Sequence, residues 1–383
     1  MLPTILILVT VIVLFVLKFN YSNNVLKVFG LNLFVIVSVL LIHFFLNGAN
    51  NHENEFFKFI FRVITALSVL LAYSSFKREV LKDFIWVMNI LLVHSVFNFL
   101  FGLILFDNLE FVKTEQIDVL TFKYIFFYFS ESSSSGFFFL RNQGVFWEPG
   151  VLSVFLNILL FVYLFVRPNI TRALVVFATI FTTYSTTGLV LSFLLFIVRY
   201  NKNIRKSFTA LFIGAIAIGV LLPLIIENVN DKVSGNGEAS FYWRSYDLLI
   251  SFQIVSENPL KGIGFGGEVY KKVQEQNNMF MQSDILEGRG NTNSMVYIFI
   301  AFGIPIAIYI LYLLYNQTIF PYKNKYLFFI VSIICLSTEP LITSVFFLVI
   351  VFSQLFSIQK KSLYEPNLQL FEPNIKLNIT NNI

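Results

Sequence analysis

The chain has 383 residues, of which 57% are hydrophobic and only 13% charged, and its mean hydropathy is +0.75. Apolar runs of roughly 17 to 25 residues recur along it, each long enough to cross a bilayer, so the composition predicts a polytopic membrane protein and excludes a soluble globular one. The net charge of +5 does not indicate a nucleic-acid partner, because the basic residues lie beside the apolar runs.

The predicted membrane spans extend over almost the whole chain. We expect an all-α fold with about eleven transmembrane helices, in which residues 1–358 form a single membrane domain and residues 359–383 a cytoplasmic tail. The first run lacks a basic start and a small-residue cleavage site, so we expect a retained span and not a signal peptide. The expected spans are 2–18, 26–47, 56–75, 82–106, 149–166, 172–184, 186–199, 206–226, 293–315, 325–339 and 341–358.

Basic residues indicate which ends of these spans face the cytoplasm. They gather in every second connection, as cytoplasmic loops do, so the C-terminus is predicted to be cytoplasmic. Lys58 and Arg62, near the outer start of the third span, are the exception, and for them anchoring at the interface is favoured over a position inside the bundle. The cytoplasmic groups are Lys18 and Lys27; Lys77, Arg78 and Lys82; Arg167 and Arg172; Arg199, Lys202, Arg205 and Lys206; Lys323 and Lys325; and Lys360 and Lys361.

Two long connections, at about 107–148 and 227–292, fall on the outer side. Long ordered loops commonly carry binding and catalytic residues. In the first, "SESSSSG" is predicted to be a flexible hinge, and the apolar "FFFL" after it a segment on the membrane surface. The loop ends in "RNQGVFWEPGVL", which places Arg141 seven positions before Glu148 at the start of an apolar span.

Arg141 and Glu148 each have a structural and a functional interpretation. Arg141 is either an interfacial anchor or, with Arg244 and Arg289 of the second loop, one of three guanidinium groups that grip phosphate or pyrophosphate. Glu148 precedes Pro149, which suits the first position of a helix, where the helix dipole favours a carboxylate. Alternatively, Glu148 is a general base for an acceptor hydroxyl or the ion-pair partner of Arg141.

The later loops contain two further patterns. "YSTTG" joins the short sixth and seventh spans, which are either two separate spans or a broken, re-entrant helix. In the second outer loop an amphipathic helix is predicted to end at Asn258-Pro259. The "KGIGFGG" that follows fits the dinucleotide pattern G-x-G-x-x-G, but the absence of a preceding strand argues against that site. A tight turn around Gly264 whose amides hold an anion remains.

The other candidate residues also have two interpretations. Asn293 either caps the next span or binds substrate, and Trp147 and Trp243 either stack on sugar rings or belong to an interfacial aromatic belt. Glu339, before Pro340 at the outer end of the tenth span, is costly at membrane depth and is expected to have a partner. The one cysteine, Cys335, and three scattered histidines predict neither a disulfide nor a metal site.

Taken together, these stretches resemble the O-antigen polymerase and ligase superfamily of bacterial envelopes. The shared features are an arginine followed by "GVFWEP" at the start of a helix, "STTG" between two short spans, "RSYDLLISFQIVSENPLKGIGFG" in a large outer loop, and "NS" at the start of a span with "FGIP". The resemblance covers residues 140–345, and the N-terminal quarter matches only as generic membrane helices.

The resemblance implies a GT-C-like fold and a glycosyltransferase of the bacterial cytoplasmic membrane without a cofactor. Its donor and acceptor would be polyprenyl-pyrophosphate-linked oligosaccharides, and a chain-length regulator and a flippase would be its partners. Arg141, Arg244 and Arg289 would stabilise the departing pyrophosphate. Glu148 would be the first choice to accept the proton of the acceptor hydroxyl, with Glu339 or Asp247 as the second choice. Ligases carry a histidine before the asparagine that ends the large loop. Thr292 occupies that position here, which favours a polymerase.

Three alternatives stay open. A ligase of the same superfamily would transfer finished chains and not single repeats. A flippase or other transporter would also need cations near an anionic lipid, although it would be expected to show inverted repeats. A non-catalytic membrane scaffold would tolerate replacement of Arg141 and Arg244.

Overall fold

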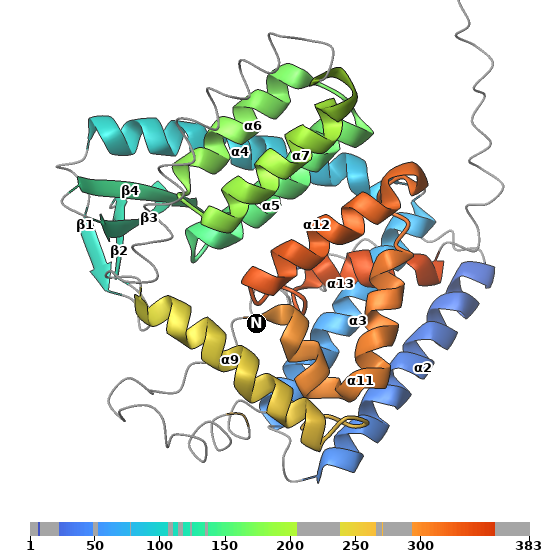
Figure 1. Cartoon of the computed structure of the whole chain (residues 1–383). Helices are drawn as coiled ribbons and strands as arrows, with labels where there is room; N and C mark the ends of the chain where they lie inside the picture. Colours follow the sequence, from blue (N-terminus) through green and yellow to red (C-terminus); the bar gives the residue numbers. More distant parts are fainter. Residues whose placement is uncertain are drawn as a thin grey trace, which may run out of the picture.

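The computed structural model of the chain describes residues 7, 23–48, 53–76, 78–105, 110–113, 118–122, 125–134, 137–204, 238–265, 270 and 293–356. This part is mainly helical and contains one four-stranded sheet (Figure 1). Five of its helices are long and apolar enough to cross a membrane, so a membrane-embedded, mainly helical architecture is confirmed. The tail at 359–383 and nearly all of the expected spans at 2–18 and 206–226 lie outside the described residues.

Most helix bounds agree with the predicted spans to within a few residues. The five long helices are α2 (Asn23–Asn47), α3 (Glu53–Ser75), α4 (Val80–Ile104), α5 (Pro149–Phe161) with its π-helical continuation η3 (Val162–Val166), and α11 (Ser294–Tyr315). The others are α6 (Ile170–Thr182), α7 (Thr186–Ile204), α9 (Glu238–Glu257), α12 (Lys325–Thr338) after the short η6 (Tyr322–Asn324), and α13 (Val345–Phe352). A total of eleven crossings stays a prediction.

The last predicted span, 341–358, begins too early. Its first residues form a turn, in which the amide of Ser344 donates to the carbonyl oxygen of Leu341 at 2.9 Å. The Ser344 hydroxyl then accepts from the amide of Phe347 at 3.4 Å and caps α13, which begins at Val345. The stretch after Pro340 is apolar enough to resemble a span, but a capping serine determines where the helix starts.

An antiparallel sheet occupies much of the first predicted outer loop. Its strands, in the order β1-β2-β3-β4, are β1 (Glu110–Lys113), β2 (Asp118–Phe122), β3 (Ile125–Ser134) and β4 (Phe137–Gly144). The prediction of a hinge followed by a surface segment is therefore wrong, because β3 pairs with β4 from Ser134 opposite Phe137 to Ser130 opposite Arg141. Aromatic and β-branched residues favour strands. The all-α expectation is corrected to a mainly helical fold with one small sheet.

The helices form two groups that meet at α12 (Figure 1). In one group α5 packs against α4, α6, α7 and β4, and in the other α3 packs against α2 and α13, while α11 packs against α9 and α13. α12 contacts α5, α7 and α11. In the most apolar stretch of α5, 78% of the residues are buried, against 11% in α2. α5 is apolar on nearly every side, which suits a helix at the centre of a bundle.

Three of the connections that carry basic residues, those before α4, after η3 and before α12, lie together at one end of the bundle. Arg167, after η3, forms an ion pair with Glu79, ahead of α4, at 3.6 Å. Asn324, ahead of α12, donates its side-chain amide to the carbonyl oxygen of Phe165 at 2.8 Å. The pattern of basic loops predicts this gathering, and that this end faces the cytoplasm stays a prediction.

α11 is broken at Gly303, where φ is +75° and ψ is 173°. The segment that follows α9 supplies hydrogen-bond partners for the broken turn. The amides of Ile263 and Gly264 donate to carbonyl oxygens of α11 at 2.8 and 3.1 Å, and the amide of Ile304 donates to the carbonyl oxygen of Pro259 at 2.7 Å. Irregular backbone is tolerated at membrane depth only where protein or a water-filled cavity satisfies its polar groups, and this segment does so.

Candidate functional site

Asn142 fixes the end of β4 to the helices around the start of α5. It is fully buried, and its side-chain amide donates to the carbonyl oxygen of Ser95 in α4 at 3.0 Å and to the hydroxyl of Thr182 in α6 at 3.1 Å. Its side-chain oxygen accepts from the amide of Gly144 at 3.1 Å. A buried amide bonded to two helices holds the neighbouring Arg141 in a defined position. "RNQG" is therefore a structural motif as well as the carrier of an arginine.

Arg141 is half-buried and faces the break between α6 and α7. Its Nε donates to the carbonyl oxygen of Thr183 at 3.3 Å, at the C-terminal end of α6. The C-terminus of a helix carries partial negative charge and favours a cation. In the break Tyr184 has φ +48°, so the chain leaves α6 by a left-handed residue before α7 begins. The helical path is thus interrupted at "YSTTG", a feature that both predicted alternatives, two separate spans and a broken, re-entrant helix, share.

α5 and α7 approach each other closely beside this break. The side-chain amide of Asn157 donates to the carbonyl oxygens of Ser153 in its own helix and Gly188 in α7, at 2.8 and 3.1 Å. A Cβ at Gly188 would lie 2.8 Å from the Ser153 side chain. The glycine of "STTG" therefore allows the helix contact, and Asn157 joins the two helices.

Glu148 and Pro149 begin α5 as predicted. Pro149 is at the start of the helix and Glu148 occupies the N-cap position with an extended backbone, but the Glu148 side chain makes no capping hydrogen bond. Trp147, immediately before them, has 52% of its surface exposed. The Glu148 carboxylate thus lies at the positive end of the helix dipole without serving as its cap.

Glu339 reaches the same helix start from α12. It is buried, with an exposed fraction of 5%, and its side chain lies so close to Gly150 that a Cβ at that glycine would overlap Oε1. Its backbone carbonyl accepts from the hydroxyl of Ser294, the first residue of α11, at 2.6 Å. Of the predicted site residues, Glu148 and Glu339 are thus brought to one turn of α5, and Arg141 lies on a strand that packs against this helix.

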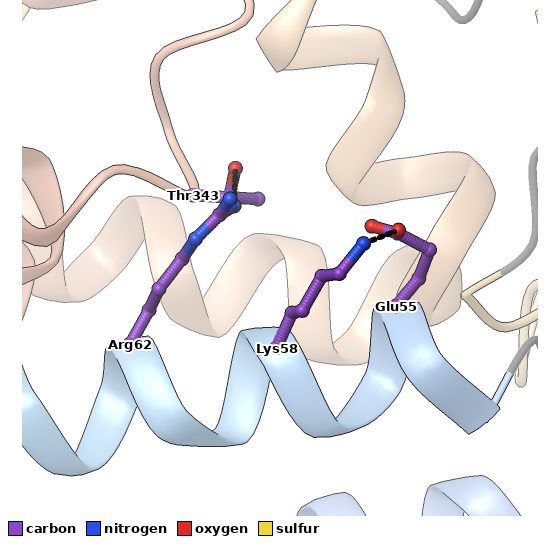
Figure 2. A network of polar contacts seen from close by, with 4 residues as sticks. All are labelled: Glu55, Lys58, Arg62 and Thr343. Carbon is purple, nitrogen blue, oxygen red and sulfur yellow. Dashed lines mark hydrogen bonds and ion pairs between the residues drawn. The ribbon is translucent and has the colours of Figure 1, made fainter. Parts of the chain in front are cut away.

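A second polar region, which sequence analysis did not predict, lies between α3, α11 and the turn before α13. A cavity of about 120 Å³ is lined there by Glu55, Phe59, Arg62, Phe265, Ser294, Tyr297, Pro340, Ile342 and Thr343. Arg62 extends to its wall, and Nη1 donates to the Thr343 hydroxyl at 3.3 Å (Figure 2). Lys58 instead pairs with Glu55 at 2.6 Å at the surface. The favoured interpretation of Arg62 as an interfacial anchor is therefore wrong, because its side chain points into the bundle.

Two predicted substrate-binding residues have structural roles. The amide of Gly264 is donated to α11, so the interpretation as an anion-binding nest is wrong for this group. Asn293 caps α11, because its side-chain oxygen accepts from the amides of Met295 and Val296 at 3.0 and 3.2 Å. The capping interpretation is confirmed.

The remaining predicted site residues belong to the second outer loop. Arg244 and Trp243 lie on α9, which ends at Glu257 immediately before Asn258-Pro259, as predicted; their side chains are outside the described part of the chain, as is all of Arg289. Among the residues that the structure describes, no three His, Cys, Asp or Glu side chains form a group that could hold a metal ion.

The site residues that sequence reasoning missed depend on distant partners. An arginine six positions after the start of the predicted apolar span 56–75 was a signal for Arg62, but length and spacing alone do not show whether such a side chain turns outward or inward. For Asn142 the signal was weaker, because asparagine is ordinary in a loop and its burial depends on α4 and α6.

Comparison with protein-family models, with curated proteins and with solved structures finds no match to this chain.

Proposed function

We propose that this chain is a membrane glycosyltransferase of the O-antigen polymerase type. It joins polyprenyl-pyrophosphate-linked oligosaccharide repeats on the outer face of a bacterial cytoplasmic membrane, for an O-antigen, a capsule or an exopolysaccharide. The expected fold is the GT-C-like fold of that superfamily, with eleven transmembrane helices and a cytoplasmic C-terminus.

The observation that carries the proposal is the set of ionisable side chains around the first turn of α5. Arg141 lies on a strand that contacts this helix, Glu148 precedes it, and the buried Glu339 lies against Gly150. The basic connections gather near the other end of α5, at Phe165 and Arg167, so the positive-inside rule assigns the first turn to the outer face. A cation and two carboxylates at that face suit a reaction between an anionic lipid-linked donor and a sugar hydroxyl.

The reaction needs little covalent chemistry from the protein. The acceptor hydroxyl oxygen attacks the anomeric carbon of the donor, the bond from that carbon to the pyrophosphate oxygen breaks, and the pyrophosphate leaves with the bonding pair. Arg141 and Arg244 would stabilise the charge that grows on the leaving group. Glu148 would accept the hydroxyl proton, with Glu339 as the second choice. Holding the two sugars in line supplies much of the rate.

Replacement of the arginines tests the proposal. We expect Arg141→Ala and Arg244→Ala, at matched membrane levels, each to lower the yield of long polymer by roughly 10²-fold, the usual effect of removing a charge-stabilising group. A single-repeat band should remain on a gel of surface polysaccharide.

Arg172→Ala is the matched control, since this arginine lies at the other end of the bundle, and its polymer ladder should equal that of the wild type. Unchanged ladders in both test variants would refute the proposal. Finished chains that accumulate on the polyprenyl carrier would indicate a ligase instead, and a loss of all repeats from the outer face would indicate a flippase.

A further inference from the structure

Arg62 is an arginine inside the bundle whose donors are mostly unused by the described residues. Within the described part of the chain its one hydrogen bond goes to Thr343, and it makes no ion pair there. The nearby carboxylate of Glu55 is already paired with Lys58. An ionised side chain at membrane depth is costly unless it has a partner. A guanidinium presents five N–H donors in a plane that fits phosphate, so this partner is expected to be an anion.

The cavity beside Arg62 favours a phosphate group attached to an apolar chain. α11 begins on one wall and the turn before α13 forms another, so two helix N-termini, where the helix dipole is positive, lie at the same cavity as the guanidinium. The hydroxyls of Thr343 and Tyr297 also line the cavity, whereas that of Ser294 is already bonded to Glu339 and Ile342.

Part of the cavity lining is aromatic. Phe59 and Phe265 lie there with ring centroids 4.7 Å apart in a stacked arrangement. A lining with apolar rings as well as a cation and hydroxyls matches a phosphorylated lipid better than a free ion, because the rings would cover an apolar chain while the guanidinium and hydroxyls would offset the cost of desolvating the phosphate.

We propose that this cavity binds the phosphoryl group of a phosphorylated lipid and that Arg62 is its principal ligand. Arg62 is nine residues from the start of α3, about 14 Å along the helix axis. The residues from Pro340 to Thr343 that line the cavity directly follow Glu339, so the site adjoins the start of α5. That the phosphorylated lipid is the lipid-linked substrate rests on the proposed function, whereas the cation site itself does not.

Binding to the full-length protein in phosphatidylcholine nanodiscs tests the inference, with farnesyl pyrophosphate as the probe and a thermal-shift titration as the readout. We expect Arg62→Gln to weaken binding roughly 10-fold or more, as loss of a charged hydrogen bond does. Arg78→Gln, which removes an exposed arginine just beyond the other end of α3, should stay within about twofold of the wild type, because that position is at the opposite end of the helix from the cavity.

Wild-type affinity in Arg62→Gln would overturn the inference. If that variant does not fold, Arg62→Lys decides: the loss of the planar fork should weaken binding about threefold or more, and unchanged binding would overturn the site.

Two further measurements identify the source of the phosphoryl group. Competition by phosphatidylglycerol in the nanodisc supports a site for lipid headgroups, and binding that persists in its presence supports a site for the lipid-linked substrate. Because no polymer is made in this assay, unchanged ladders in both Arg141→Ala and Arg244→Ala would refute the polymerase and leave this site standing.

Discussion

Gly150 leaves no room for a side chain at the first turn of α5. A Cβ there would overlap the carboxylate of Glu339, which therefore occupies space that any other residue would fill. Gly150→Ala is expected to displace Glu339 and to lower the free energy of unfolding by about 1–3 kcal/mol, as over-packing in a filled interior does. The measurement is the midpoint of thermal unfolding of the purified protein in detergent.

Gly30→Ala is the control for this substitution. Gly30 lies in α2, and no atom lies within 4 Å of the position that a Cβ would occupy there, so alanine should leave the protein unchanged or raise its stability by up to about 1 kcal/mol. Equal midpoints for the two alanine variants would contradict the close packing of Glu339 against α5.

Local rules explain which residues of the candidate site could be predicted from the sequence. Pro149 after Glu148 is the pattern of a helix start, and Asn293 before Ser294 is that of a cap, so both positions were predicted correctly. The inward direction of Arg62 depends on Thr343, 281 positions further along the chain, and no local rule contains that information.

The packing of the segment after α9 against the break in α11 depends on Gly262. Gly262 has φ +63°, and a Cβ there would lie 2.6 Å from the amide nitrogen of Gly303 and also overlap the carbonyl oxygen of Ile300. Gly262→Ala should therefore separate the segment after α9 from α11 and lower the free energy of unfolding by about 3 kcal/mol or more, through left-handed strain together with overlap.

Gly48→Ala separates these two causes, because Gly48 also has a left-handed φ, +50°, but no atom within 4 Å of a Cβ. It should show only the strain of about 1–2 kcal/mol. If the unfolding midpoints of the two variants in detergent fall equally, the packing against the break contributes nothing.

Helices were easier to predict than strands in this chain. Their long apolar runs leave few alternatives, and eight of the predicted spans correspond to α2, α3, α4, α5, α6, α7, α11 and α12 within a few residues. β3 and β4 carry serines and aromatic residues that composition assigns equally well to a hinge and a surface segment. Their identity depends on pairing with each other, which composition does not reveal.

The orientation of the whole molecule can be tested with one introduced cysteine at a time. The single native cysteine, Cys335, is buried, so it should contribute little background. In intact cells, a membrane-impermeant maleimide should label Glu53→Cys, at the start of α3, and not Arg172→Cys, at the basic end of the bundle. Both should label after the membrane is opened. The reverse pattern in intact cells would invert the topology and place the start of α5 in the cytoplasm.

The arrangement of the two helix groups was beyond sequence analysis. Lipid-facing and bundle-facing sides of these helices are both apolar, so periodicity does not show that α5 is enclosed while α2 is mostly exposed. The alternation of basic connections still predicts the orientation of the helices, because it depends on the residues at the helix ends and not on which helix face is buried.

The contact between α2 and the segment after α9 has a consequence for biosynthesis. In α2, Nε2 of His43 lies 2.8 Å from the carbonyl oxygen of Lys261, a partner that lies 218 positions later in the chain. At about 5–20 residues per second, the ribosome needs roughly 10 to 45 s to make the intervening chain. During that interval the imidazole is in the membrane or at the translocon without this acceptor. α2 can pack against α3 early, but its contact with the segment after α9 is expected to form late, and nascent chains arrested before Pro259 should leave the His43 face of α2 accessible to membrane quality control.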